Sequence, residues 1–473
     1  MLNEETFFAP VRQLAAKIRS RQISSVELTE GYLDRLEKIG PRLGAVVTIT
    51  RDLAMKEAKA ADREIRAGKY RGPLHGIPYG VKDLLATAGI PTTWGAAPYK
   101  NQVFNYDATV VTKLRKAGAV LVAKLAMIEL AGGLGYNNPD ASFTGPTRTP
   151  WNLGFWSGGS SSGPGSATAA GLVGFSIGSE TSGSIVTPSA YCGLAGLRPT
   201  YGRVSRHGAM ALCWTLDKLG PICRSADDCG LVLAAIAGVD PADPTSVALP
   251  FTYSQTSQRT RRFKIGVLKN ATSGCQPEVQ KNFEDSLKVL SEFADLDDTA
   301  EFPTDLQYGV VGTIVAAEGA SAFREIIENG KVQELQTPRD RIGGFTAMTV
   351  FAVDYIDAMR HRVKVQKGME AVCAKYDAVV APSRNTVASP IDVDFDKAFP
   401  EMRNQRPGAP APPVIAAGNL AGQPAISVPN GFGQNGLPTG IQFQGKAFSE
   451  DKLLAIANAY QKATDWHTKH PKV

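Results

Sequence analysis

Two short segments rich in glycine and serine hold the side chains best placed to do chemistry in this sequence. Residues 157–163 read SGGSSSG, and residues 178–185 read GSETSGSI. Between them, the small residues of 166–171 predict a helix, and residues 172–177 predict a buried strand. The two hydroxyl-rich loops therefore flank a short helix–strand unit, and they could converge at one end of a sheet.

Composition alone leaves three interpretations of these loops open. They are glycine-rich turns whose serines cap helices, a phosphate-binding loop, or a site with a serine nucleophile. A P-loop needs a lysine followed by Ser or Thr at the start of its helix, and neither segment contains a lysine. The GxGxxG pattern is absent from both segments as well, which disfavours nucleotide binding.

A serine nucleophile needs a neighbouring base that removes its proton. The chain has five histidines, none in an evident catalytic turn, and no GxSxG elbow surrounds the serines. Lysine is the other candidate base, and Lys82 lies in the largely apolar stretch 77–83. A charged side chain there is costly unless it is paired or neutralised. Lys82 is therefore either an ordinary lysine at a strand end or a neutral base.

Several motifs in a fixed order give the sequence a resemblance to the amidase signature family of Ser–cisSer–Lys hydrolases. The resemblance covers nearly the whole chain, and the 24 residues from Ser160 to Ser184 match the family spacing. It implies an α/β fold with one large domain, in which helices cover both faces of a mixed β-sheet. The motifs are Pro73–Pro78, Val81–Asp83, Gly158–Ser161, Gly183–Ile185, Gly422–Pro429 and Gly436–Gln442.

The resemblance also implies roles for individual residues. Ser184 corresponds to the nucleophile, Lys82 to the base and Ser160 to the serine between them, with a cis peptide bond after Gly159. Lys82 must then be a neutral amine, and burial would lower its pKa from the usual value of about 10.4. The resemblance further implies an oxyanion site of backbone N–H groups and a loop that faces the acyl chain. These are Thr181, Ser182, Gly183 and Ser184 for the oxyanion, and Ala131, Gly132 and Gly133 for the acyl loop.

The implied activity is hydrolysis of a neutral amide C–N bond through an acyl-enzyme, and an aryl amide or a carbamate (urethane) fits the same machinery. The alternative is a glutaminase-type subunit of an amidotransferase complex, which passes ammonia to a partner. Two departures from the family pattern bear on this choice. Ser182 replaces the usual glycine, and Val186 replaces the usual arginine. Because glutaminase subunits normally keep that arginine, Val186 favours the stand-alone hydrolase. The chemistry requires no cofactor and no metal.

Helical and strand patterns alternate along the 473 residues, which is typical of a sheet covered by helices on both faces. Residues 24–27 form a capping box that predicts the start of a helix. Asp107 is a candidate cap for a helix that ends near Gly118, and residues 119–123 read as the buried strand after it. Further strands are predicted at 264–268, 376–382 and 425–429, and a last helix at 449–464.

No internal repeat or charged linker divides the chain, so we expect a single domain over residues 1–473, with the catalytic motifs within about 70–200. The stretch of about 240–350 has the least regular pattern and predicts a cap-like, substrate-facing insertion. Aromatic residues cluster in sequence around the nucleophilic loops. Most are expected in the core, and any that line the entrance would favour an apolar or aryl substrate.

Charge and cysteine content exclude several other classes of protein. Lys and Arg number 51 against 45 Asp and Glu, and they are scattered, whereas nucleic-acid binding needs a basic face. The six cysteines form no CxxC pair, which indicates reduced thiols and a cytoplasmic location. No run approaches the roughly 18 apolar residues that span a bilayer. We therefore expect a small-molecule substrate, no nucleic-acid or membrane partner, and a monomer or homodimer.

Overall fold

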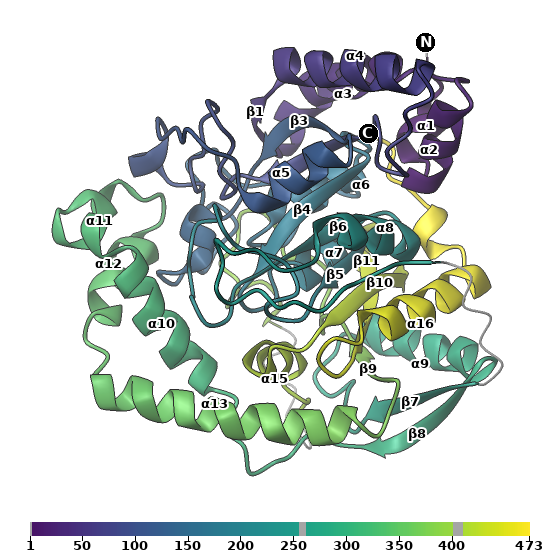
Figure 1. Ribbon diagram of the computed structural model, residues 1–473. Helices are drawn as coiled ribbons and strands as arrows, with labels where there is room; N and C mark the ends of the chain where they lie inside the picture. The colour runs from purple at the N-terminus through teal and green to yellow at the C-terminus, as the bar shows by residue number, and fades with distance from the viewer. Residues whose placement is uncertain (1, 255–261, 401–409) are drawn as a thin grey trace.

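The framework of the molecule is one mixed sheet of eleven strands, in the order β1-β3-β2-β4-β6-β5-β10-β11-β9-β7-β8 (Figure 1). The computed structural model describes residues 2–254, 262–400 and 410–473. Its sheet confirms the predicted α/β fold. The strands are β1 (Val46–Ile49), β2 (Pro78–Lys82), β3 (Val120–Leu125), β4 (Phe175–Glu180), β5 (Ala195–Arg198), β6 (Lys218–Cys223), β7 (Phe263–Leu268), β8 (Ala294–Ala300), β9 (Ala378–Pro382), β10 (Ala425–Phe432) and β11 (Pro438–Gln444).

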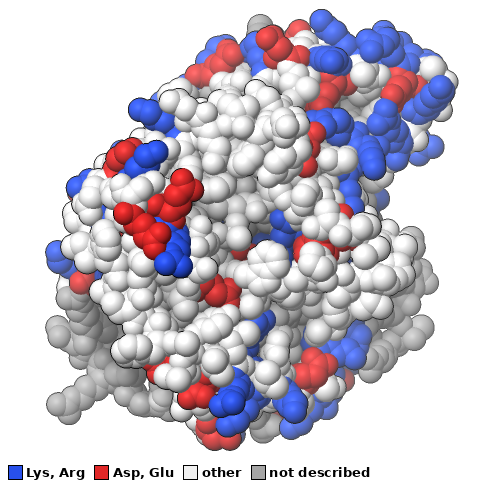
Figure 2. All heavy atoms as spheres, turned by 60° about the vertical axis from the view of Figure 1, so that its left-hand side comes forward, with Lys and Arg blue, Asp and Glu red and all other residues white. Residues whose placement is uncertain are grey.

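Helices pack around this sheet, and one group of them stands to one side. The helices are α1 (Glu4–Phe8), α2 (Val11–Arg19), α3 (Ser25–Leu43), α4 (Arg51–Arg66), α5 (Thr109–Lys116), α6 (Ser162–Ala169), α7 (Val186–Cys192), α8 (Ala226–Ile236), α9 (Pro277–Ser291), α10 (Val310–Ala322), α11 (Arg324–Glu328), α12 (Pro338–Ala347), α13 (Ala352–Cys373), α15 (Val414–Ala421) and α16 (Glu450–Ala463). The group at the left of Figure 1 is α10 to α13. Figure 2 brings that side forward and shows a hollow bordered mainly by uncharged residues.

The direction of two central strands brings the chemistry-bearing loops together. β2 pairs in parallel with β4, so the carboxyl ends of both strands lie at the same edge of the sheet. Lys82 is the last residue of β2, and Glu180 is the last residue of β4. The segment 178–185 therefore leaves the sheet next to Lys82.

Most of the elements expected from the sequence are present. α3 begins with the predicted capping box, in which Ser24 and Glu27 each accept a hydrogen bond from the other's backbone N–H. The strands predicted at 119–123, 264–268, 376–382 and 425–429 are β3, β7, β9 and β10, and the last predicted helix is α16.

The predicted cap of α5 is wrong. With Asp107 as its N-cap, the helix would begin at Ala108. It begins one residue later, at Thr109, and Ala108 is its N-cap. The Asp107 carboxylate is unavailable for capping, because it accepts the backbone N–H of Ala88 and forms an ion pair with Arg115.

The boundaries predicted for the helix–strand unit between the serine loops are shifted. The helix, α6, covers 162–169 instead of 166–171, and the strand, β4, covers 175–180 instead of 172–177. Gly171 adopts a positive φ of 62°, which turns the chain out of the helix. Residues up to Gly174 form the connecting turn, so the strand starts three residues late and ends at Glu180.

The stretch 240–350 contains two different kinds of structure. β7, α9 and β8 extend the main sheet at its edge, whereas α10, α11 and α12 form part of the helical group beside it. A cap-like role for this stretch stays a prediction.

All six cysteines are buried and unpaired. Within residues 2–254, 262–400 and 410–473, no single helix is both long and apolar enough to cross a membrane, while α12 and α13 pass that test only as a pair bent by 95°.

Candidate active site

A continuous chain of hydrogen bonds joins the three residues singled out in the sequence. The Nζ of Lys82 donates to the Oγ of Ser160 at 2.7 Å, and the Oγ of Ser160 donates to the Oγ of Ser184 at 2.9 Å. Lys82 Nζ also bonds Ser179 Oγ at 2.9 Å. Ser184 is 9% exposed, whereas Lys82 and Ser160 are inaccessible. A small molecule can therefore reach only the last hydroxyl of the chain.

The bridging serine is positioned by a tightly packed turn before α6. The peptide bond between Gly159 and Ser160 is cis, in agreement with the resemblance. Gly158 has a φ of +84°, and a Cβ there would lie 2.8 Å from the backbone of Pro188 in α7. A side chain at Gly158 would thus separate the two segments that carry Ser160 and Ser184.

The turn that carries Ser184 is held by the carboxylate at the end of β4. One oxygen of Glu180 accepts the backbone N–H groups of Ile185 and Val186 at 2.8 and 3.0 Å. These groups belong to the start of α7, where backbone N–H groups lack intrahelical partners. Glu180 therefore satisfies them and fixes Ser184 against the sheet.

Glu180 is itself part of a buried network of charges. Its other oxygen accepts from Arg198 Nη1 at 3.0 Å and from Asn419 Nδ2 at 2.9 Å. Lys218 Nζ donates to the Oδ1 of Asn419 at 2.7 Å. Burial alone would raise the pKa of Glu180, but the positive charges of Arg198 and Lys218 and these hydrogen bonds lower it to about 2. The carboxylate therefore stays ionised at every physiological pH.

The environment of Lys82 favours the neutral amine. Burial lowers its pKa from 10.5 to about 7, against the opposing effect of the negative charges of Asp217 and Glu180. A substantial fraction of Lys82 is therefore unprotonated near neutral pH, as a base requires.

The four predicted oxyanion residues lie between Glu180 and α7. Thr181 donates its hydroxyl to Asp217 Oδ1 at 2.6 Å, whereas the side chain of Ser182 is exposed. Ser182 stands where the family usually has glycine, and because it is exposed, its side chain does not fill the predicted oxyanion site. Gly183 has a φ of +92°, which favours glycine. That their N–H groups bind an oxyanion stays a prediction.

The predicted acyl loop is split between two concave sites. Ala131 lines the same cavity as Ser179 and Thr181, whereas Gly132 and Gly133 line a groove against α10 and α12. Ala131 has a positive φ of 56°, which is unusual for a residue with a Cβ. The structure thus brings Ala131, but not its two neighbours, to the cavity beside the serines.

This cavity encloses about 240 Å³. Its wall includes Ser179, which bonds Lys82, so it lies next to the hydrogen-bonded chain. Much of the remaining wall is apolar. These apolar side chains are Leu84, Ala131, Met210, Leu212, Trp214 and Leu219.

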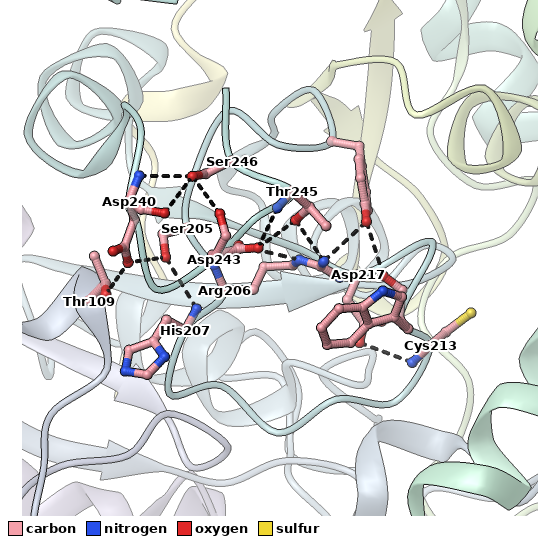
Figure 3. Close-up of polar contacts among 12 residues, drawn as sticks. Thr109, Ser205, Arg206, His207, Cys213, Asp217, Asp240, Asp243, Thr245 and Ser246 are labelled. Atoms are coloured by element: carbon pink, nitrogen blue, oxygen red, sulfur yellow. Dashed lines mark hydrogen bonds and ion pairs between the residues drawn. The ribbon is translucent and has the colours of Figure 1, made fainter. Parts of the chain in front are cut away.

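The charged side chains around the cavity already have partners within the protein (Figure 3). Asp217 accepts the N–H groups of Leu212 and Cys213 in addition to the Thr181 hydroxyl. Arg206 donates to Thr245 and to the carbonyl of Trp214, and its Nε lies 3.8 Å from Asp243. The network holds the two loops that form the cavity, residues 205–217 and 240–246.

These cavity residues were not recognised in the sequence. The segment 205–217 carries Arg206, His207 and Asp217, but in sequence such residues look like an ordinary polar loop between β5 and β6. A weak signal was present in the apolar residues Met210, Leu212 and Trp214, which recur at every second position.

Metal-ligating clusters give no further site. Among the residues that the structure describes, no group of three or more His, Cys, Asp or Glu side chains could hold a metal ion.

Over almost its whole length the chain matches a protein family and individual relatives. A family model described as Amidase matches residues 27–454. A glutamyl-tRNA(Gln) amidotransferase subunit from Geobacter metallireducens is 36% identical, over 98% of this chain and 99% of its own.

Solved structures are similar as well. The peptide amidase of Stenotrophomonas maltophilia has a TM-score of 0.84 and 31% identity, covering 96% of this chain and 97% of its own. A chain from a vestigial protein complex related to the origins of an s-triazine catabolic enzyme has a TM-score of 0.88 and 27% identity, covering 98% and 100%.

Proposed function

Because this chain belongs to the amidase signature family, we propose that it hydrolyses an uncharged amide through an acyl-enzyme formed on Ser184. The observation that carries the proposal is the unbroken series of contacts from Lys82 through Ser160 to Ser184, at 2.7 and 2.9 Å. Each contact is short enough for a proton to pass directly from one group to the next, and the hydroxyl hydrogens can rotate so that Ser184 donates to Ser160 and Ser160 donates to Lys82.

The proposed reaction begins with neutral Lys82. It takes the proton of Ser160, which takes the proton of Ser184 as the Ser184 oxygen attacks the carbonyl carbon. Backbone N–H groups of residues 181–184 stabilise the oxyanion, each donor contributing up to about 3–4 kcal/mol. The C–N bond breaks as the proton returns through Ser160 to the leaving nitrogen. Water then attacks the acyl-enzyme and releases the acid.

The cavity supports an uncharged acyl group. Its free surface is mainly apolar, and the charges of Arg206, Asp217 and Asp243 are bound within the protein. Val186 supplies no cation next to the nucleophile. A substrate that carries a full charge would therefore lose hydration without gaining a partner. A carbamate presents the same kind of carbonyl group and is a candidate substrate on the same grounds.

A second candidate function is glutamine hydrolysis within an amidotransferase complex. It is supported by curated relatives at 34 to 36% identity that are named as subunits of glutamyl-tRNA(Gln) amidotransferase. Glutamine carries both an ammonium and a carboxylate group, and for these charges the cavity offers few unbound partners. We therefore place the uncharged amide first.

A substrate panel tests the choice. The purified chain alone is incubated with an anilide, a primary amide, a carbamate and glutamine, and the product amine or ammonia is measured. Turnover of the anilide, together with an acyl adduct on Ser184 found by mass spectrometry, supports the proposal. Turnover of glutamine in preference to the anilide would favour the amidotransferase role instead.

A further inference from the structure

Trp214 is both a part of the cavity wall and open to solvent. It lines the cavity beside the catalytic residues, and its side chain is 56% exposed. Ligand pockets are concave and are lined mainly by apolar and aromatic side chains, so an aromatic ring in the wall of this cavity is a candidate contact for a ligand.

The backbone at Trp214 is fixed from two sides. Its carbonyl oxygen accepts from Arg206 Nη1 at 2.6 Å and from the Tyr201 hydroxyl at 3.1 Å. The next residue, Thr215, donates its N–H and its hydroxyl to Glu318 of α10, at 2.9 and 2.7 Å. Trp214 is therefore exposed without lying on a loose loop.

The indole ring is supported as well. The guanidinium carbon of Arg206 lies 5.3 Å from the ring centroid, within the range of a cation–π contact. Arg206 cannot easily leave, since Thr245 accepts from its Nη2 and Asp243 lies 3.8 Å from its Nε (Figure 3). A ring held in this way offers a flat apolar surface at little entropic cost.

The rest of the wall suits a flat group. Leu84, Met210 and Leu212 contribute aliphatic surface, and Ser179, which bonds Lys82 at 2.9 Å, brings the wall next to the hydrogen-bonded chain. The cavity therefore offers apolar surface for a planar ring next to the hydrogen-bonded chain that ends at Ser184.

We propose that Trp214 forms the wall of an aryl-binding subsite, which makes the enzyme select amides whose acyl group is a planar aromatic ring. This inference rests on the proposed acyl-enzyme mechanism and adds the class of acyl group to it. Offset or edge-to-face contacts with an indole favour an aromatic ring over a saturated ring of similar size, by about 3- to 10-fold in affinity.

The test compares substrates that share one leaving group. The 4-nitroanilides of benzoic, cyclohexanecarboxylic and acetic acid differ only in the acyl group, and kcat/KM is measured for each. In Trp214→Ala the benzoyl-to-cyclohexanecarbonyl ratio should fall about 3- to 10-fold, while Trp214→Phe should keep most of the preference. The control is Phe351→Ala, which removes a ring that is 72% exposed and lies outside the cavity; it should leave the ratio unchanged.

An unchanged ratio in Trp214→Ala overturns the subsite, and so does an equal fall in Phe351→Ala. Circular dichroism and thermal unfolding verify that each variant is folded.

A binding measurement separates the subsite from the mechanism. In the Ser184→Ala background, calorimetry compares the affinity for benzanilide with and without Trp214→Ala. Weaker binding on loss of the indole supports the subsite, and equal binding refutes it, whether or not acylation occurs. Absence of an acyl adduct on Ser184 in the otherwise unaltered chain would contradict the proposed function alone.

Discussion

The proposed catalytic centre and the helical group α10–α13 distribute polar and apolar side chains in opposite ways. At the centre, Lys82, Glu180 and Arg198 are completely buried. On α12 and α13, large apolar side chains face solvent: Ile342 is 64% exposed and Val353 66%. Buried charges are uncommon in soluble proteins, and so are several large apolar side chains exposed on one face.

The difference shows which interactions stabilise each region. The centre accepts a large desolvation cost and offsets part of it with specific partners for its charges. Burial lowers the pKa of Lys82, whereas the positive charges of Arg198 and Lys218 lower the pKa of Glu180. The α12–α13 face keeps apolar surface in water and gains no burial energy from it. We therefore expect substitutions at the centre to have large effects and substitutions on that face to have small ones.

The largest effect is expected for Ser184→Ala. Removal of the proposed nucleophile should lower kcat for an anilide by at least about a thousandfold and abolish labelling by a fluorophosphonate. Single-turnover kinetics and mass spectrometry measure the two effects. Ser182→Ala is a matched control, because it removes an exposed hydroxyl from the same loop and should change kcat/KM less than threefold. Persistent labelling in Ser184→Ala would show that another residue is the nucleophile.

A large loss of stability is expected for Arg198→Met. The substitution leaves Glu180 buried without its arginine, and breaking such a pair costs about 3–5 kcal/mol. The free energy of unfolding is measured by urea titration. The control, Arg324→Met, breaks an exposed pair with Glu328 and should cost less than about 1 kcal/mol. Similar losses in the two variants would refute the contrast between buried and exposed charges.

The pH dependence of activity should reflect Lys82. In the proposed mechanism the neutral amine of Lys82 is the base, and its pKa is about 7. The value of kcat/KM should therefore rise about tenfold per unit of pH below that pKa and level off above it. Lys82→Arg should be nearly inactive across the range, because arginine stays protonated. A profile in the unaltered enzyme that is flat between pH 5 and 9 would exclude Lys82 as the titrating base.

The same shift affects stability with a definite sign. Between the folded pKa of about 7 and the usual value of 10.5, the unfolded chain binds more protons at Lys82 than the folded chain does. Stability should therefore rise with pH across this window, to the extent that Lys82 controls it. In Lys82→Met that contribution should be lost.

The smallest effect is expected for Phe351→Ser on the helical face. Phe351 is 72% exposed, so its replacement should change the free energy of unfolding by no more than about 0.5 kcal/mol. Urea titration at two protein concentrations measures this. A loss above about 2 kcal/mol that depends on concentration would mean that the face is covered by another copy of the chain.

The sequence predicted the reacting residues of the centre but not the charged residues that surround them. The resemblance located Lys82, Ser160 and Ser184, and the alternating patterns located most strands, because motif spacing and periodicity are local properties. The partners of Glu180 could not be found in this way. Arg198, Lys218 and Asn419 lie far from Glu180 in sequence, and a charged residue looks solvated until the fold buries it.

The start of α5 and the cavity could not be predicted from the sequence for a related reason. The start of α5 depended on which atoms compete for the Asp107 carboxylate, and that competition involves Ala88 and Arg115 in the folded chain. The cavity was missed because its wall combines segments from residue 84 to residue 244. Its shape arises only when those segments meet.

The bonds of Asp217 have a consequence for anyone who wishes to redesign the specificity of this protein. One oxygen of its carboxylate holds the Thr181 hydroxyl, and the other holds the backbone of Leu212 and Cys213. Asp217 therefore joins the loop that carries Thr181 to the segment that lines the cavity. The lining side chains can be replaced, whereas Asp217 itself must be kept. Libraries for new acyl groups belong at Met210, Leu212 and Trp214, which line the cavity, and they should leave Asp217 unchanged.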